Sequence, residues 1–314
     1  MITKFKTTVS TRINAIGLPV LALIWVGFFW GTTWIASKEG VRYIPGIQMA
    51  AIRQFIAGAI YIVFFLFTKT PWPKGKQWNT IVILAILNFT LSNGLSTAGV
   101  KYISSGLGAI IAAIFPIWIV LISFFKGEKI AQLAAIGVFV SFGGVCIIFY
   151  EYLADFLIPD FRFGIFLSVL ATITWAFGTL YTKKKAASYN PYFSLGFQMF
   201  ISGLLLFAYN AAAGISVSVR EIPMETWLAI AYLVVVGSLI TFTVFIYSLQ
   251  NLPPEVSSLY AYMNPVVAVL LGSAIFGESL SISIALGGLV TLSGLYLVNK
   301  SLRQSRKKTN ILIK

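Results

Sequence analysis

Long apolar runs, each about 20 residues, alternate along the chain with short polar segments. Within runs such as IVILAILNF and AVLLGSAIF the apolar residues are continuous, whereas a membrane-spanning β-strand would alternate apolar and polar positions. A helix of about 20 residues crosses the hydrocarbon core of a bilayer. The pattern therefore predicts an all-α membrane protein with ten transmembrane helices. Their expected ranges are 18–37, 46–67, 78–98, 104–125, 130–150, 163–182, 192–213, 226–249, 255–276 and 281–299.

The composition supports a membrane location. Hydrophobic residues make up 58% of the 314 residues and charged residues only 10%, whereas a soluble domain carries about 25% charged residues. This deficit excludes a soluble enzyme and a disordered chain. The net charge of +14 does not indicate nucleic-acid binding, because the Lys and Arg residues lie in short gaps between apolar runs. The expected partners are the lipid bilayer and a small-molecule substrate, with no nucleic acid.

The distribution of Lys and Arg predicts the orientation in the membrane. With ten spans, both termini and every second gap face one side, and that side holds 17 of the 23 Lys and Arg residues. Because positively charged segments stay in the cytoplasm, we expect the N-terminal segment 1–17 and the basic tail 300–314 to be cytoplasmic. The gap 151–162 is then external. The tail is either a retention or lipid-contact segment or simply solvated.

The chain repeats itself once, with a period of about 147 residues. The segment WGTTWIASK, which begins at Trp30, aligns with WAFGTLYTK, which begins at Trp175. At similar offsets other pairs coincide: Arg53 with Gln198, Gly58 with Gly203, Pro116 with Pro265, Gly127-Glu128 with Gly277-Glu278, and Gly144 with Gly294. We therefore expect two repeats, over 18–150 and 163–299, with five spans each.

Five is an odd number, so the second repeat must enter the membrane in the opposite sense to the first. Inverted repeats, related by a pseudo-two-fold axis in the membrane plane, are typical of secondary transporters. In such proteins the substrate site lies near the bilayer midplane, at the interface of the repeats. The two halves exchange conformations and so open the site to each side in turn. The fold class expected here is thus two inverted five-helix repeats that work by alternating access.

The motifs in both halves also resemble a known family. WGTTWIASKEGVRYIPGIQMAAIRQFIAG resembles the opening of the EamA family of the drug/metabolite transporter superfamily. A proline, then Gly-Glu, then a glycine-rich last span follow in each half, as in VSSLYAYMNPVVAVLLGSAIFGESLSISIALGGLVTLSGL. The resemblance implies ten spans and a place in a bacterial inner (plasma) membrane. It also implies export of amino acids, other metabolites or drugs. One departure is Gln198, which stands where the first half has Arg53.

Aromatic and polar side chains inside the spans are the candidate substrate-binding groups. Amides facing lipid are costly, and aromatic rings stack on rings or contact cations. The candidates are Trp30, Trp34, Arg53, Asn88, Asn93, Trp175, Gln198, Tyr260 and Asn264. Arg53 is the only cation well inside an expected span. It either faces the pathway, where its planar guanidinium would bind a carboxylate, or extends to the outer interface of the membrane.

Two prolines mark expected bends. Pro116 and Pro265 lie near the middle of the fourth and ninth spans and are related by the repeat. Each removes one helix hydrogen bond and clashes with the carbonyl four residues earlier. Either they are simple packing kinks or they are hinges, and their symmetric placement favours hinges.

Four charged residues lie at expected span ends. Lys38 and Lys183 are related by the repeat and are candidate gate charges or interfacial anchors. Glu128 and Glu278 each follow a glycine and are expected to cap short turns.

Several kinds of chemistry lack the residues they need. The sequence contains no His, and Cys146, its single Cys, is expected to act as a small buried hydrophobe. No Asp or Glu lies deep within an expected span. We therefore expect no cofactor, no metal site and no catalytic residue, which argues against an intramembrane enzyme. Without a buried carboxylate or a His, proton coupling lacks support, and facilitated diffusion or exchange is the simpler mechanism.

The sequence thus predicts a secondary transporter that exports small metabolites such as amino acids. One alternative is a nucleotide-sugar or phosphorylated-metabolite exchanger, which would require several cations near the midplane. Another is a structural or signalling membrane protein without cargo. The fifth and tenth spans carry stripes of small residues, which favour close packing within a monomer, while a homodimer contact remains an alternative. The stripes are Gly137, Ser141 and Gly144, and Gly287, Thr291 and Gly294.

Overall fold

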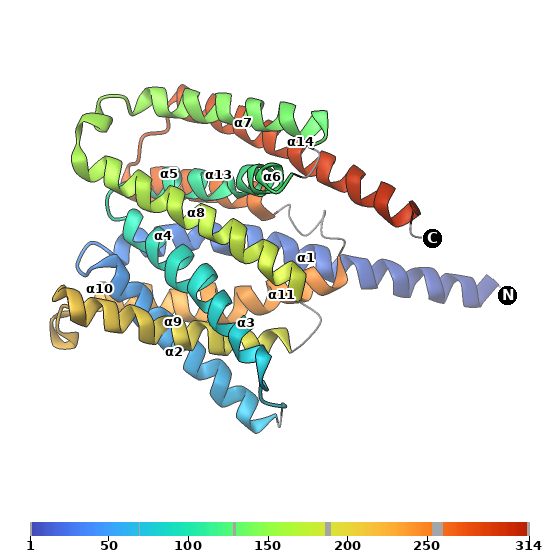
Figure 1. The fold of residues 1–314 in the computed structure, drawn as a ribbon, viewed down its shortest axis with the longest axis horizontal. Coiled ribbons are helices and arrows are strands. Elements are labelled where there is room, and N and C mark those ends of the chain that lie inside the picture. Colours follow the sequence, from blue (N-terminus) through green and yellow to red (C-terminus); the bar gives the residue numbers. More distant parts are fainter. Residues whose placement is uncertain (1, 69, 128–129, 186–189, 253–259, 313–314) are drawn as a thin grey trace.

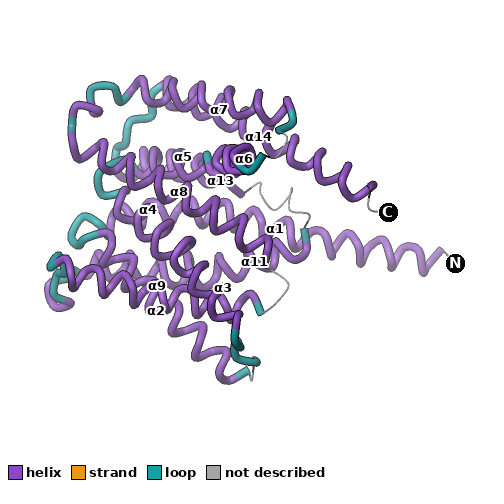
Figure 2. The backbone as a smooth tube through the Cα atoms, in the orientation of Figure 1, coloured by secondary structure: helices purple, strands orange, loops and turns teal. Residues whose placement is uncertain are grey.

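The computed structural model describes residues 2–68, 70–127, 130–185, 190–252 and 260–312. Throughout these ranges the regular secondary structure is helical, and Figure 2 shows no strand among them. Nine helical stretches within the described ranges are long and apolar enough to cross a membrane, and three of them join consecutive helical elements. A further apolar helix, Tyr260–Phe276, has 17 residues and directly follows a segment outside the described ranges. The expectation of an all-α protein with ten spans is confirmed.

The first half contains five spans, of which the third and fourth are interrupted. The third begins as a regular α-helix, continues as a π-helix and ends as an α-helix, and the fourth breaks at Ile114. The elements are α1 Ile2–Gly40, α2 Gly46–Phe67, α3 Lys76–Leu84, η1 Ala85–Asn93, α4 Gly94–Gly99, α5 Ser105–Ala113, α6 Phe115–Phe125 and α7 Gln132–Glu151.

The second half repeats this plan. The third span of the second half also contains a π-helix, at the position equivalent to the π-helix of the first half. This shared irregularity supports the duplication. The elements are η2 Asp155–Leu157, α8 Pro159–Lys185, α9 Pro191–Ala213, η3 Val219–Glu221, α10 Met224–Tyr232, η4 Leu233–Ile240, α11 Thr241–Asn251, α13 Tyr260–Phe276 and α14 Ile282–Leu312.

Local sequence signals set several of these helix ends. Asn190 caps α9, because its side chain accepts hydrogen bonds from the backbone N–H groups of Tyr192 and Phe193. The same helix ends at Gly214, whose left-handed φ of 63° favours glycine. Ser104 caps α5 by accepting from the N–H of Leu107. Each of these capping residues lies next to an apolar run in the sequence.

The two repeat-related prolines differ in local structure. Pro116 lies in the first turn of α6, directly after the break at Ile114. Pro265 lies inside α13, which continues through it. A hinge role for either proline stays a prediction.

The halves pack as two outer helix pairs around a central group. In Figure 1, α7 runs beside α14 at the top and α2 runs beside α9 at the bottom, and the two chain ends lie on the same side. In the centre, α1 packs against α11 and α13, and α8 packs against η1, α4 and α6. The first helix of each half therefore contacts the third and fourth spans of the other half, so the interface between the halves is the centre of the molecule.

Small residues let the outer pairs approach closely. A Cβ added to Gly137 would lie 2.7 Å from the carbonyl oxygen of Gly294, and the Ser141 hydroxyl donates to the carbonyl oxygen of Thr291 at 3.2 Å. The same holds for Gly58 and Gly203 between α2 and α9. The stripes of the fifth and tenth spans therefore meet within the chain.

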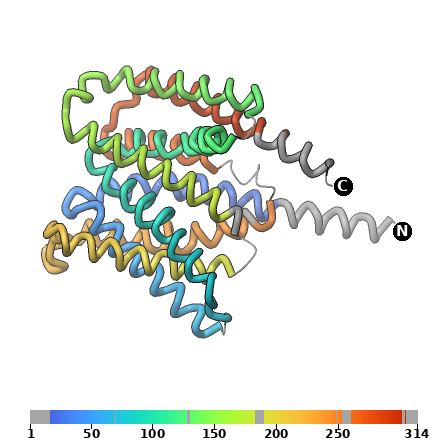
Figure 3. Tube along the Cα trace, viewed as in Figure 1, coloured from blue at the N-terminus to red at the C-terminus, as the bar shows by residue number. Residues whose placement is uncertain are grey.

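The expectation for Cys146 is wrong. Its side chain is free and exposed on α7, the helix that forms an outer pair with α14. Figure 3 traces α7 in green along the edge of the bundle. Hydrophobicity alone does not distinguish a lipid-facing position from a protein-facing one, which is why the sequence misplaced this residue.

Candidate substrate cavity

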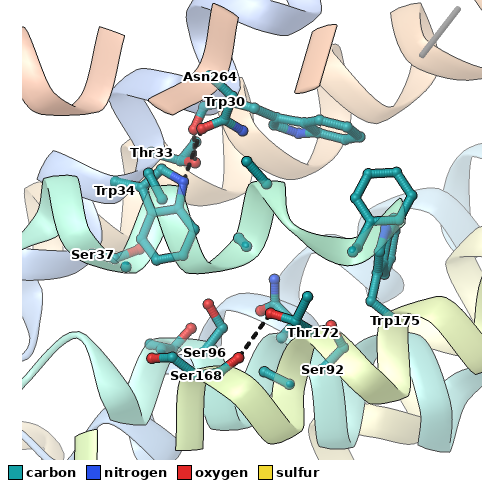
Figure 4. Close-up of a pocket in the computed structure, with 18 of the residues that line it drawn as sticks. Trp30, Thr33, Trp34, Ser37, Ser92, Ser96, Ser168, Thr172, Trp175 and Asn264 are labelled. Carbon is teal, nitrogen blue, oxygen red and sulfur yellow. Dashed lines mark hydrogen bonds between the residues drawn. The ribbon is translucent and has the colours of Figure 1, made fainter. Parts of the chain in front are cut away.

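A cavity of about 170 Å³ lies at the interface of the two halves. Its walls come from α1, α2, the third and fourth spans, α8, α11 and α13, so both halves contribute. Figure 4 shows these side chains converging from several helices. The lining residues are Trp30, Thr33, Trp34, Ser37, Arg53, Asn88, Ser92, Asn93, Ser96, Thr97, Gly108, Ala109, Ala112, Ala113, Phe115, Ser168, Ala171, Thr172, Trp175, Phe242, Tyr260, Ala261, Asn264 and Pro265.

One wall of the cavity is aromatic. The Trp30 ring lies edge-on to Phe242 and Tyr260, with ring centroids 4.9 Å and 5.1 Å away. Its indole N–H donates to the carbonyl oxygen of Gly237 at 3.2 Å. Trp30 is thus held both by ring contacts and by a hydrogen bond, which orients a rigid apolar face at the cavity.

A second tryptophan of α1 contacts a polar residue of α13. The indole N–H of Trp34 donates to Oδ1 of Asn264 at 3.0 Å, and Figure 4 shows this bond as a dashed line. The ring also lies close to α5, since a Cβ added to Gly108 would be 2.8 Å from it. Asn264 and Trp34 therefore reach the cavity as a hydrogen-bonded pair.

Arg53 supplies positive charge to the cavity wall. Its side chain is 5% exposed, and Nε donates to Oγ of Ser238 at 2.9 Å. The Tyr61 hydroxyl donates to the Ser238 carbonyl oxygen at 3.2 Å, which ties this part of η4 to α2. The guanidinium is buried between the halves and lines the cavity. None of the cavity-lining side chains that the structure describes is a carboxylate.

The π-helix η1 brings further amides to the cavity. Asn93 accepts a hydrogen bond at Oδ1 from Nε2 of Gln54, which is fully buried on α2. Asn88 packs directly against Gly178 of α8, and its Oδ1 is buried with no partner among the described residues. A π-helix within a span often marks a functional site, and here it faces the cavity with both amides.

Several cavity hydroxyls are missing from the sequence-based candidates. They recur every four residues, which places them on one face of a helix. Ser92 and Ser96 lie on the third span, Ser168 and Thr172 on α8, and Thr33 and Ser37 on α1. This spacing within apolar runs is a signal that would have identified them. The Thr172 hydroxyl is occupied, because it donates to the Ser168 carbonyl oxygen at 2.8 Å.

Most of the predicted binding residues reach the cavity, and one does not. Trp30, Trp34, Arg53, Asn88, Asn93, Trp175, Tyr260 and Asn264 line it, together with Pro265. Gln198 does not, because its Nε2 donates to Oγ of Ser194 on its own helix. Pro116 also lies outside the lining. Glu128 and the side chain of Lys183 lie outside the described residues.

Lys38 and Glu278 hold the turn between the third and fourth spans. Nζ of Lys38 donates to the carbonyl oxygens of Val100 at 2.9 Å and Ile103 at 2.6 Å. The Glu278 carboxylate accepts from the N–H of Ser105 at 2.6 Å and from its hydroxyl at 2.9 Å. Glu278 therefore caps α5, a helix of the other half, rather than its own turn. These two charges connect α1 and the end of α13 to one turn of the first half.

Acidic and sulfur ligands do not gather anywhere within the described ranges. No group of three or more His, Cys, Asp or Glu side chains there could hold a metal ion. The described lining residues offer aromatic faces, amides, hydroxyls and one guanidinium for recognition.

Comparison with known proteins places the chain among membrane transporters. The sequence profile of the EamA-like transporter family matches residues 17–150 and 162–300, one match in each half. The chain is 28% identical to the inner membrane transporter YedA of Escherichia coli over 266 residues, which cover 84% of this chain and 85% of YedA. It is 30% identical to the transporter sll0355 of Synechocystis over 315 residues, which cover 95% of this chain and 93% of that one.

Similarity extends to other organisms and to a solved structure. The transporter YvbV of Bacillus subtilis is 26% identical over 284 residues, covering 89% of this chain and 90% of YvbV. One crystal structure shares the fold with a TM-score of 0.64 at 18% identity, over 92% of this chain and 98% of that chain.

Proposed function

We propose that this protein transports a small metabolite that carries a carboxylate, such as an amino acid. The chain belongs to the EamA-like transporter family, so it is a multi-pass membrane transporter and not an enzyme. The proposed mechanism is export by alternating access. The direction rests on the resemblance to a family in which many members are exporters.

The observation that carries the cargo class is the buried Arg53. A guanidinium removed from water without a counter-ion is costly, and none of the described lining residues is a carboxylate. Beyond the bond from Nε to Ser238, the structure gives this guanidinium no hydrogen bond to a described residue. A cargo carboxylate would supply the missing charge and accept two parallel hydrogen bonds from the planar fork. The cargo itself would thus complete the site.

The size and charge of the cavity favour a small cargo. Among the lining residues that the structure describes, Arg53 supplies the one positive charge. A phosphorylated metabolite or nucleotide sugar carries at least one phosphate group, which usually binds several cations. The aromatic faces of Trp30, Trp175 and Tyr260 suit an apolar group or an ammonium. An amino acid combines the groups that these walls can bind.

Transport of an amino-acid panel tests the proposal. Purified protein in proteoliposomes would be assayed for uptake and efflux of the twenty labelled amino acids, together with phosphorylated sugars and a nucleotide sugar. We expect at least one amino acid to move faster than in empty vesicles, and the phosphorylated compounds to show no such movement. Movement of the phosphorylated compounds alone would contradict the cargo class.

We also propose that transport is not driven by protons. The described lining residues include no Asp, Glu or His that would carry a proton through the cavity. Collapsing the pH gradient with an ionophore should therefore leave the initial rate of downhill flux unchanged within about twofold. A loss of most of the flux would reveal a proton carrier elsewhere in the protein.

The proposed orientation places both termini in the cytoplasm of a bacterial cell. A cysteine introduced at Leu157, in a Cys146→Ser background, should then react with an impermeant thiol reagent added to intact cells. A cysteine at Lys74, in a gap on the opposite side, should react only after the membrane is opened. The reverse pattern would invert the proposed topology.

A further inference from the structure

We propose that Trp34 is a positioning residue, which turns the Asn264 amide so that Asn264 presents a hydrogen-bond donor, not an acceptor, to the cargo. This inference rests on the proposed function, because it assigns a second contact to the carboxylate that Arg53 binds. It also adds a specificity rule, since the group that Asn264 contacts must accept a hydrogen bond.

The chemistry of the pair fixes the orientation of the amide. An indole N–H is a donor only, whereas an asparagine side chain carries one acceptor oxygen and two donor N–H groups. The atom of Asn264 that lies 3.0 Å from the Trp34 nitrogen must therefore be the oxygen. The amide nitrogen is left on the opposite side. In Figure 4 it points away from the indole of Trp34.

Both members of the pair pack against neighbouring helices. A Cβ added to Gly31 of α1 would lie 2.5 Å from Cβ of Val267 and 3.0 Å from the Asn264 carbonyl oxygen, so α1 and α13 approach closely here. The Trp34 ring in turn is seated against Gly108 of α5. The Asn264 backbone and the Trp34 ring are thus each packed against a neighbouring helix, and the hydrogen bond between the two side chains orients the amide.

The Asn264 nitrogen is free to bind cargo. Asn264 lines the cavity, and the structure gives its Nδ2 no hydrogen bond to a described residue. Arg53 reaches the same cavity from the other repeat. A carboxylate placed between them would accept charge-assisted bonds from the guanidinium and a further bond from the amide. A cargo that presented only donors at this point would leave the amide nitrogen unpaired.

The test measures selectivity rather than flux. In proteoliposomes, each amino acid that the wild type moves would compete against its own carboxamide derivative, and the ratio of the two inhibition constants would be determined. Trp34→Phe keeps the ring but removes the N–H, so the ratio should shift about tenfold against the carboxylate, since one bond to a charged group is lost. Asn264→Leu should give the same shift, and the double variant should give no further shift.

Trp118→Phe is the matched control. This substitution removes an indole N–H that is buried in α6 and has no partner among the described residues, and Trp118 does not line the cavity. The Trp118→Phe protein should show the same ratio of inhibition constants as the wild type. An unchanged ratio in Trp34→Phe, or additive shifts in the double variant, would overturn the proposal.

A second measurement does not depend on the cargo. With ¹⁵N-labelled tryptophan, the indole N–H signal of Trp34 should move upfield in Asn264→Leu, because a hydrogen-bonded proton is deshielded, while the Trp30 signal stays in place. A wild type that moves no amino acid would count against the proposed function. A Trp34 signal that does not move in Asn264→Leu overturns the inference, whatever the protein transports.

Discussion

Arg53→Gln is expected to lower the apparent affinity for a carboxylate-bearing cargo by about 10–100-fold while the protein still folds. The substitution copies the residue that the second half uses at the equivalent position, Gln198. Glutamine keeps a hydrogen-bonding group but loses the charge, and a bond to a charged group contributes about 1.5–3 kcal/mol, where about 1.4 kcal/mol is a factor of ten. Removing an unpaired buried cation should not destabilise the fold. The measurement is the KM for uptake into proteoliposomes.

Two further variants show whether the effect on KM depends on the guanidinium itself or only on positive charge. Arg53→Lys should restore only part of the affinity, because an ammonium lacks the planar fork. Arg42→Gln removes a cation from an exposed ion pair with Glu39 at the end of α1 and should leave KM unchanged. If Arg53→Gln transports with a normal KM, the carboxylate is bound elsewhere in the cavity, and Asn88, Asn93 and Asn264 become the candidates.

Gly144→Ala is expected to destabilise the protein by about 1–3 kcal/mol, the usual cost of overpacking. A Cβ at Gly144 would lie 2.6 Å from the carbonyl oxygen of Gly287 and would also meet the backbone of Thr291. Backbone atoms cannot turn aside as the end of a flexible side chain can, so α7 and α14 would have to separate. The measurement is the midpoint of thermal unfolding in detergent, which should fall by several degrees.

The neighbouring glycine provides a control in the same helix. A Cβ at Gly143 would meet nothing within 4 Å. Because alanine favours a helix over glycine by about 0.5–1 kcal/mol, Gly143→Ala should leave the midpoint unchanged or raise it. Gly288→Ala on α14 should behave in the same way, since that position is equally open. Equal effects of Gly143→Ala and Gly144→Ala would contradict the close packing of this pair.

The transmembrane spans can be predicted directly from the hydrophobicity of the sequence, and the duplication from its internal repeat. Runs of about 20 apolar residues predict spans because backbone hydrogen bonds must be satisfied inside a helix within a bilayer. The alignment of Trp30 with Trp175 and of Gly58 with Gly203 indicates the duplication, and an odd number of spans then requires inversion. Hydrophobicity does not predict the local backbone geometry. The π-helices η1 and η4 lie within apolar runs, and their sequences carry no Pro that would mark a departure from a regular helix.

The cavity was predicted in part, because depth in the membrane can be estimated from sequence but helix rotation cannot. Trp34 and Asn264 are predicted as aromatic and amide residues inside expected spans, and both line the cavity. Gln198 was chosen by the same rule, yet it turns toward Ser194 of its own helix. Cys146 was misplaced for a related reason, because its helix faces outward. The hydroxyls of Ser92 and Ser96 were overlooked although their spacing of four places them on one helix face.

Counterflow in proteoliposomes tests whether one cavity between two inverted halves carries a carboxylate cargo to each side in turn. Vesicles would be loaded with a high concentration of an unlabelled amino acid that the protein transports, and a trace of the labelled form would be added outside. Alternating access predicts that the label transiently accumulates inside above its external concentration, and that Arg53→Gln abolishes this overshoot at low concentrations of cargo. Equilibration without any overshoot, at the same rate in the wild type and in Arg53→Gln, would contradict alternating access through this cavity.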